Sequence, residues 1–418
     1  MSSSKLMKRF AALALLMALP VLASAQTSRV EGMNVPGDFV KDYTGMYTYL
    51  SGITGVGNLV YGELGTVGPV DRAVGAVLGN LWEGRTGVWG IHLRELTPAL
   101  GAGDRLGPTL DPNLNSNESF DLMWGKKFGT SSLGLRFNRS YMRVESTVPG
   151  VAATTNLKFS SNNAGDPNLL RNVTGVGGGF GFELNQATSA EISFQYQNRK
   201  FVEEPATRVF GADKNEDNGP STYLLAARAM WQWEPNVMVV PVFKYYSFDL
   251  SNKVTTAGVV TGFDNSLKGW SAGIAGNWTV GTNDLFVLGA NFAQNRAEQQ
   301  YDLFGFATAT SGDTLKITEN ISPQVFAALE THVNPWLTLR FGAQKDAFSN
   351  FKVESESRPY KATDWSSSFT MNLGAGIKIG TLQLDAIVNN NFPQNMPYLV
   401  SGAPTGPLFT KVTATYPF

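Results

Sequence analysis

Apolar and polar residues alternate along many short segments of this chain, and this period of two constrains the fold more than any other feature. The pattern runs through 368–379, 270–280 and 337–344. Successive side chains of a strand point to opposite faces, so each segment has one apolar and one polar face. The alternation predicts an all-β protein and leaves two architectures open, a sandwich and a barrel.

The lengths of the connections separate these two architectures. Tight links at 129–130, 185–186, 234–235 and 332–334 alternate with long polar ones at 96–117, 146–168, 203–220 and 251–267. A membrane barrel has one rim of short periplasmic turns and one of long extracellular loops. We therefore predict a transmembrane antiparallel up-and-down β-barrel of about sixteen strands, with fourteen as the alternative because the first three are weakly patterned. The expected strands are 56–64, 72–82, 86–95, 118–128, 131–145, 169–184, 187–202, 221–233, 236–250, 268–281, 283–300, 313–331, 335–355, 362–379, 381–390 and 405–418.

The N-terminus has the pattern of a secretion signal. Basic residues at 5, 8 and 9 precede an apolar stretch at 10–22, and Ala23-Ser24-Ala25 forms a small-residue cleavage site. The apolar stretch is too short to span a membrane. We predict a cleaved signal peptide at 1–25, an N-terminal periplasmic or lumenal segment at 26–55, and the barrel at 56–418.

The amino-acid composition agrees with a membrane barrel and excludes cysteine-dependent anchors and chemistry. The mean hydropathy of −0.11 is near zero, as expected when only every second strand residue faces lipid. The chain has no cysteine, which excludes a lipoprotein anchor, disulfides and thiol chemistry. Beyond the predicted signal, 30 basic residues stand against 34 acidic ones, so we expect no nucleic-acid partner.

The last strand carries a further signal. Lys411, Thr413, Tyr416 and Phe418 give the polar, small, hydrophobic, aromatic order that resembles the assembly signal of bacterial outer-membrane β-barrel proteins. Pro417 removes a ladder donor, which is tolerable at the end of a strand. The resemblance implies a porin-like barrel in the cell outer membrane of a Gram-negative bacterium, with outer-membrane lipid and, through Tyr416 and Phe418, the barrel-assembly machinery as partners.

Tryptophan placement agrees with a membrane boundary. Indole rings prefer the head-group level of a bilayer, whereas a soluble core would show no relation between tryptophan and turn type. Most of the tryptophans lie within a few residues of a predicted short turn: Trp82, Trp89, Trp124, Trp231, Trp233, Trp278 and Trp336.

The polar faces of the strands supply candidates for the lining of the lumen. A barrel of this size can leave a water-filled lumen whose inward residues set selectivity. Arginines from separate strands could form a constriction that attracts anionic solutes, or each could pair with a neighbouring carboxylate. The lumen-lining candidates are Arg94, Arg136, Arg228, Arg340, Lys378 and Asp385.

An aromatic stripe precedes the first strand. Phe39, Tyr43 and Tyr47 repeat every four residues, which predicts one face of a helix within 37–51. This segment could plug the lumen or be a short amphipathic helix packed only for stability. The layout is loosely similar to that of the long-chain fatty-acid transporters, which hold an N-terminal segment inside a barrel of fourteen strands. Asn58-Leu59-Val60 departs from the Asn-Pro-Ala of many such proteins, so the resemblance implies no fatty-acid site.

Enzymatic and metal chemistry find little support. The two histidines, His92 and His332, adjoin no serine motif, and no zinc, phosphate-loop or dinucleotide pattern occurs. Oxygen ligands collect at 111–118 and 213–218 without the order of an EF-hand. We expect no catalytic residue, no metal and no cofactor. The glycine-rich run 175–181 lies in a strand pattern, where it predicts close packing inside the barrel.

Three functional hypotheses follow. The first is a channel for passive passage of small solutes, suggested by the polar inward face. The second is a plugged transporter of hydrophobic compounds, suggested by the aromatic stripe. The third is a barrel that transports nothing and anchors a partner complex. The sequence specifies neither the substrate nor the oligomeric state.

Overall fold

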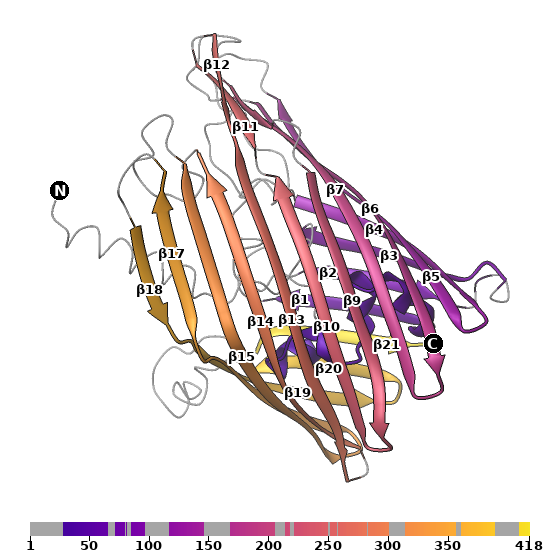
Figure 1. The fold of residues 1–418 in the computed structure, drawn as a ribbon. Coiled ribbons are helices and arrows are strands. Elements are labelled where there is room, and N and C mark those ends of the chain that lie inside the picture. Colours follow the sequence, from indigo (N-terminus) through magenta and orange to yellow (C-terminus); the bar gives the residue numbers. More distant parts are fainter. Residues whose placement is uncertain are drawn as a thin grey trace, which may run out of the picture.

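A computed structural model gives the fold and describes residues 28–65, 72–79, 81, 85–96, 117–145, 168–204, 214–217, 221–249, 251–256, 258–281, 283–300, 314–356, 361–388 and 409–418. In this part of the chain, sixteen antiparallel strands close into one barrel (Figure 1). In order around the barrel they are β1 (Leu59–Gly65), β2 (Ala73–Leu78), β3 (Val88–Leu96), β4 (Asn117–Phe128), β5 (Ser131–Glu145), β6 (Asn168–Asn185), β7 (Thr188–Glu204), β9 (Ser221–Glu234), β10 (Val237–Asp249), β13 (Asn265–Val280), β14 (Asp284–Gln299), β15 (Leu315–Asn334), β16 (Leu337–Asp346), β19 (Phe369–Ile379), β20 (Leu382–Val388) and β21 (Phe409–Pro417).

The last strand closes against the first. β21 pairs with β1 in a continuous register from Leu59 opposite Pro417 to Gly65 opposite Lys411. Pro417 is the final residue of β21, so its missing donor interrupts no ladder. The prediction of sixteen strands is confirmed, and the alternative of fourteen is wrong.

Short turns gather at one end of the barrel. β4 and β5 are joined at Gly129, β13 and β14 at Gly281, and β19 and β20 at Gly380, each with φ between 61° and 63°. This left-handed conformation is the one that tight hairpin turns require and glycine adopts without strain. By the usual arrangement of membrane barrels this end is periplasmic, and the opposite end is extracellular.

The outer wall is apolar, as a bilayer requires. Phe120 and Leu122 of β4 are exposed outward, while Asp121 and Met123, which alternate with them, are buried inside. The same alternation gives β9 to β16 a lipid-facing band. Trp231, Trp233 and Trp336 are exposed beside periplasmic turns. The chain is therefore a multi-pass β-barrel of the cell outer membrane.

No helix among the described residues is long and apolar enough to cross a membrane.

The extracellular end carries strands that the sequence did not predict. β8 (Lys214–Asp217), β11 (Asn252–Thr256) and β12 (Val259–Phe263) lie where long loops were expected. β11 pairs with β8 and β12, so two connections form a ladder beyond the wall (Figure 1). The predicted strands 335–355 and 362–379 are each interrupted, giving β17 (Ser349–Ser355) and β18 (Lys361–Ser366) as separate strands. The pairing of β8 with β11 joins two connections that are separate in the sequence, so local alternation does not reveal it.

Residues 28–55, which we call the plug segment, lie inside the barrel. They form α2 (Ser28–Gly32) and three 3-10 turns, η1 (Gly37–Phe39), η2 (Tyr43–Tyr47) and η3 (Leu50–Gly55). The predicted single helix over 37–51 is wrong. Val40 and Asp42 are extended and separate η1 from η2, while the Asp42 side chain caps η2 by accepting from the Thr44 amide.

Candidate functional site

Three apolar clusters join the plug segment to the inner wall. Near its start, Met33 and Phe39 pack with Val242 and Phe326, and the rings of Phe39 and Phe326 lie 5.0 Å apart. The end of the segment forms a second cluster, in which Leu50 and Ile53 pack with Met123. Tyr49 alone joins the third cluster, which otherwise consists of wall residues nearer the extracellular end: Leu224, Ala226, Tyr246, Phe248, Leu267, Ala297, Ile317 and Val353.

Buried ion pairs fix the same segment. Arg29 donates two hydrogen bonds of 2.8 Å to Glu330 of β15. Glu31 lies 2.7 Å from Lys411 of β21. Asp38 lies 2.8 Å from Lys244 of β10. Buried charges are tolerated only when paired, so these contacts specify one position for the segment within the lumen.

Wall side chains also satisfy the segment's backbone. Gln195 donates to the Tyr47 carbonyl at 2.8 Å, and Asn277 donates to the Phe39 carbonyl at 2.8 Å. Ser193 accepts from the Leu50 amide at 2.9 Å. A long helix would bond these groups internally, whereas here the wall supplies the partners. This explains why 37–51 folds as short turns rather than as a helix.

Glycines make room for the plug segment on the wall. A Cβ at Gly134 would lie 2.0 Å from the Leu50 carbonyl oxygen, and one at Gly179 would lie 2.9 Å from the Leu50 Cβ. A Cβ at Gly342 of β16 would lie 1.5 Å from the Met33 carbonyl oxygen. The glycine-rich run in β6 therefore belongs to a slot that receives η3. Inward-facing glycines at alternate positions were the sequence signal for this slot.

The predicted arginines lie inward, but they bind carboxylates and the plug segment. Arg136 donates to Asp121, with a shortest distance of 2.6 Å, and Arg94 lies 3.3 Å from the same carboxylate. The Arg94 guanidinium also stacks 3.9 Å from the Tyr47 ring centroid. The expectation of a cationic constriction for anions is not met at these two positions, because a buried carboxylate lies between the arginines.

Of the remaining lumen-lining candidates, Arg340, Asp385 and Arg228 form ion pairs, whereas Lys378 does not take part in these networks. Arg340 lies 2.6 Å from Glu330 and 2.7 Å from Asp385, so Glu330 joins it to Arg29. Arg228 lies 2.7 Å from Glu191. Lys378 is exposed at the periplasmic end of β19 and lies outside these networks. The sequence missed Arg29, Glu31, Asp38 and Tyr49, whose roles depend on partners more than 170 residues away.

The predicted aromatic stripe is spread over different contacts. Phe39 packs on Phe326, while Tyr43 lies 5.3 Å from Tyr61 between ring centroids. The Tyr47 and Tyr61 hydroxyls are 2.6 Å apart, and the Tyr61 hydroxyl is 3.2 Å from Nδ1 of buried His92. Burial raises the pKa of the Tyr47 phenol well above its ordinary value, so it remains neutral in this network.

Removing the Tyr47 hydroxyl should have a moderate effect on stability. In Tyr47→Phe, Tyr61 loses one buried hydrogen bond, and we expect the free energy of unfolding to fall by about 0.5–1.5 kcal/mol. Urea unfolding in lipid vesicles measures this change. The control is Tyr141→Phe, since Tyr141 is exposed on the outer face of β5. If the two substitutions lowered the free energy of unfolding equally, the hydrogen bond between Tyr47 and Tyr61 would not contribute to stability.

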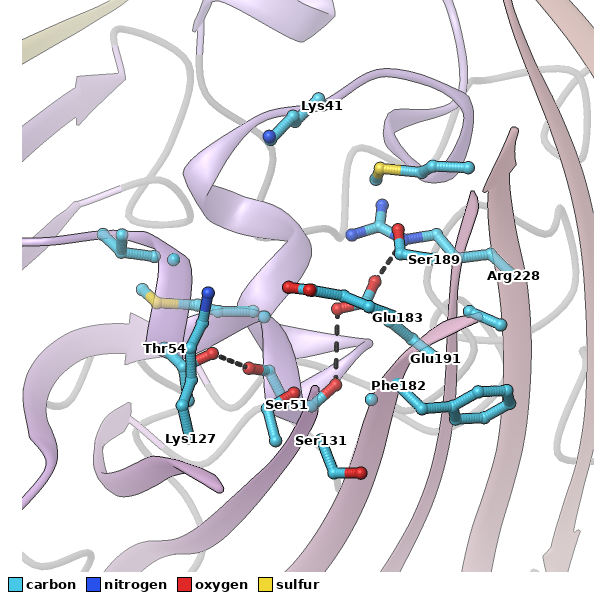
Figure 2. A pocket seen from close by; sticks show the side chains of 18 of the residues that line it. Lys41, Ser51, Thr54, Lys127, Ser131, Phe182, Glu183, Ser189, Glu191 and Arg228 are labelled. Atoms are coloured by element: carbon cyan, nitrogen blue, oxygen red, sulfur yellow. Dashed lines mark hydrogen bonds and ion pairs between the residues drawn. The ribbon is translucent and has the colours of Figure 1, made fainter. Parts of the chain in front are cut away.

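A cavity of about 520 Å³ lies at the periplasmic end, between the plug segment and the wall of β4 to β9. Figure 2 shows Glu191 between Ser51 of η3 and Arg228 of β9. The Arg228 guanidinium also stacks 4.1 Å from the Tyr49 ring centroid. Tyr49 and Arg228 therefore separate this cavity from the apolar cluster on its extracellular side. Hydroxyls line much of the cavity: Ser51, Thr54, Thr130, Ser131, Ser132 and Ser189.

The candidate metal-binding loops are only partly described. Residues 111–116, 213 and 218 lie outside the described residues, and Asp217 accepts a hydrogen bond of 2.9 Å from the Phe201 amide. In the described part of the chain, no group of three or more histidine or acidic side chains could hold a metal ion.

Comparisons with known proteins give only distant likenesses. No family model and no curated protein matches the chain. The toluene transporter TodX of Pseudomonas putida is 8% identical with a TM-score of 0.37, over 96% of this chain and 94% of that one. TbuX of Ralstonia pickettii, also a toluene transporter, is 9% identical with a TM-score of 0.36, over 94% and 97%. The siderophore receptor PiuA of Acinetobacter baumannii is 10% identical with a TM-score of 0.41. The match covers 71% of this chain and 53% of the receptor, so this chain spans only about half of the receptor's length. Likenesses at this level carry no argument about substrate or mechanism.

Proposed function

We propose that this protein is an outer-membrane transporter of small hydrophobic or amphipathic compounds, closed at rest by its plug segment. The observation that carries the proposal is the docking of residues 28–55 in the lumen through apolar clusters, buried ion pairs and a glycine slot. A permanently open pore needs a hydrated lumen, and the contacts of residues 28–55 with strands on several sides of the wall support a lumen that is closed at this level.

The two sides of the lumen suggest the chemistry of the solute. Inward positions of β9, β10, β13, β14 and β15 carry an apolar cluster with Leu224, Phe248 and Ile317, beside polar groups such as Lys244 and Asn277. Inward positions of β3 to β7 and β16 to β21 carry charges and amides, as with Asp121 and Arg340. A compound with an apolar body and a polar end could contact both sides. The periplasmic cavity also falls in the size range of small-ligand sites.

Passage would require η2 and η3 to move, because Tyr49 and Arg228 close the way between the apolar cluster and the cavity. A disulfide lock tests this step, since the chain has no cysteine of its own. A Cβ at Gly181 would lie 3.2 Å from the Ser51 Cβ, within a few tenths of an ångström of disulfide geometry. The variant is Ser51→Cys with Gly181→Cys.

Proteoliposomes allow uptake to be measured with a hydrophobic dye, N-phenyl-naphthylamine, beside the sugar maltose. We expect the native protein to accelerate dye uptake and to exclude maltose. Oxidation of the double cysteine variant should abolish dye uptake, and reductant should restore it, while either single cysteine variant is unaffected. Maltose entry through the native protein would indicate an open channel, and no dye uptake would indicate a barrel that transports nothing. Unchanged uptake by the oxidised double variant would exclude a moving plug segment.

A further inference from the structure

A row of cations crosses the outer face of the barrel near its extracellular end. Lys268 of β13 lies directly opposite Arg296 of β14 in the sheet register. Arg296 is opposite Thr318 of β15, which is opposite Lys352 of β17. Lys268 and Arg296 are exposed and point outward, because the neighbouring Leu267 and Ala297 are buried inward. The row therefore lies on the surface that faces lipid or solvent.

The aromatic residues below this row fix its level in the membrane. Tyr245 and Trp270 are opposite each other, two residues nearer the periplasm than the cations. Phe243 and Phe292, one further step down, are exposed at 42% and 43%. Aromatic rings of this kind mark the boundary between hydrocarbon and head groups. The cations thus lie at the head-group level of the outer leaflet.

The cationic pair lacks a partner in the described part of the chain. Lys352 lies 2.7 Å from Glu354, but neither Lys268 nor Arg296 forms an ion pair with a described residue. Like charges directly opposite each other destabilise a sheet. The closest acidic position in the register is Glu298, one step above Arg296 and opposite Lys316. An anionic ligand would relieve the repulsion between Lys268 and Arg296.

A cavity of about 510 Å³ is lined by Lys268, with the paired Arg296 outside its lining, and combines cations, hydroxyls, amides and carboxylates. Lys268 and Lys316 are its cations, and Lys316 is bound to Glu356. Its hydroxyls include those of Tyr223 and Ser247. The other carboxylates are Asp249, Asp264 and Glu298. Cations attract phosphate, whereas carboxylates repel phosphate but accept hydrogen bonds from sugar hydroxyls. This combination suits a phosphorylated saccharide better than a simple phosphate ester.

We propose that this cavity binds the phosphorylated saccharide head group of a glycolipid in the outer leaflet. Lys268 and Arg296 hold a phosphate, and the carboxylates and hydroxyls of the cavity bind the sugar. The acyl chains then lie along the apolar band below Tyr245 and Trp270. This proposal depends on Lys268 and Arg296 of the outer face, which the transport proposal does not use.

Native mass spectrometry of the full chain in detergent can test the site with diphosphorylated lipid A as the probe. The test variant is Lys268→Gln with Arg296→Gln, and the charge-matched control is Arg139→Gln with Lys200→Gln, two exposed outward cations on β5 and β7. Each cation at a membrane surface contributes about fivefold in affinity, so the test variant should bind roughly thirtyfold more weakly and the control unchanged.

The nature of the ligand is tested with three further probes. Removing both phosphates from lipid A should weaken binding to the native protein to the level of the double variant. Phosphatidylglycerol and inorganic phosphate should bind more weakly than diphosphorylated lipid A, because they lack the saccharide. Equal binding of lipid A to the native protein and the test variant, or equal binding of phosphatidylglycerol and lipid A, would overturn the proposal.

Discussion

Replacing Gly134 with valine should displace the plug segment and open the barrel to ions. The new Cβ would lie 2.0 Å from the Leu50 carbonyl oxygen and 2.6 Å from the Ser51 amide nitrogen. Both contacts are with backbone, so no side-chain rotation relieves them. Overpacking of this kind costs about 1–3 kcal/mol, which corresponds to a roughly five- to 150-fold rise in the undocked fraction.

Single-channel recording in planar bilayers measures the effect as discrete conductance steps, which we expect the native protein to lack. Two substitutions in β6 give a matched comparison. Gly179→Val points inward against Leu50 and should also produce steps, whereas Gly178→Val points outward, where a Cβ meets only the Leu135 side chain at 3.8 Å. A folded Gly134→Val protein that stays closed would show that the plug segment does not block the lumen.

Removing Arg340 should destabilise the barrel more than any other single change of charge in the lumen. Its guanidinium binds both Glu330 and Asp385, and Glu330 also binds Arg29 of the plug segment. In Arg340→Met, Asp385 loses this cation while it stays buried. Breaking a buried ion pair in this way costs about 3–5 kcal/mol, so the midpoint of urea unfolding in lipid vesicles should fall clearly.

Two other variants check the cause. Lys345→Met removes an exposed cation from the same strand, one that binds only the Ser367 hydroxyl at 2.7 Å, and should change the midpoint little. Arg340→Lys keeps the charge but cannot bind both carboxylates with the same planar geometry. Its urea midpoint should therefore lie between those of Arg340→Met and Lys345→Met. A loss in Arg340→Met no larger than that in Lys345→Met would mean that the network contributes nothing to stability.

The wall of this barrel could be predicted from the sequence to a large extent. The predicted strand 131–145 matches β5, and 118–128 differs from β4 by one residue. This success has a physical reason. A strand that separates lipid from a polar interior must alternate along its own length, so the signal is local. The inward direction of Arg136 and Arg340 followed from the same alternation.

The contents of the lumen could not be predicted in this way. The repeat of Phe39, Tyr43 and Tyr47 suggested one helical face, yet Phe39 packs on Phe326 of β15 while Tyr43 and Tyr47 contact Tyr61 of β1. These partners are set by where the strands come together. Helical spacing is a weak guide when the backbone groups of a segment find partners outside it.

The sequence by itself determined that this chain forms an outer-membrane barrel, with its lipid-facing band and its two unequal rims, while the structure fixed the strand number at sixteen. Only the tertiary structure decided what fills the barrel. Glu31 meets Lys411 across 380 residues of chain, and Ser28 meets Thr413 across 385. Alternation is imposed by the bilayer on each strand separately, whereas the plug segment is held by contacts with strands from many parts of the chain, which come together only in the folded barrel.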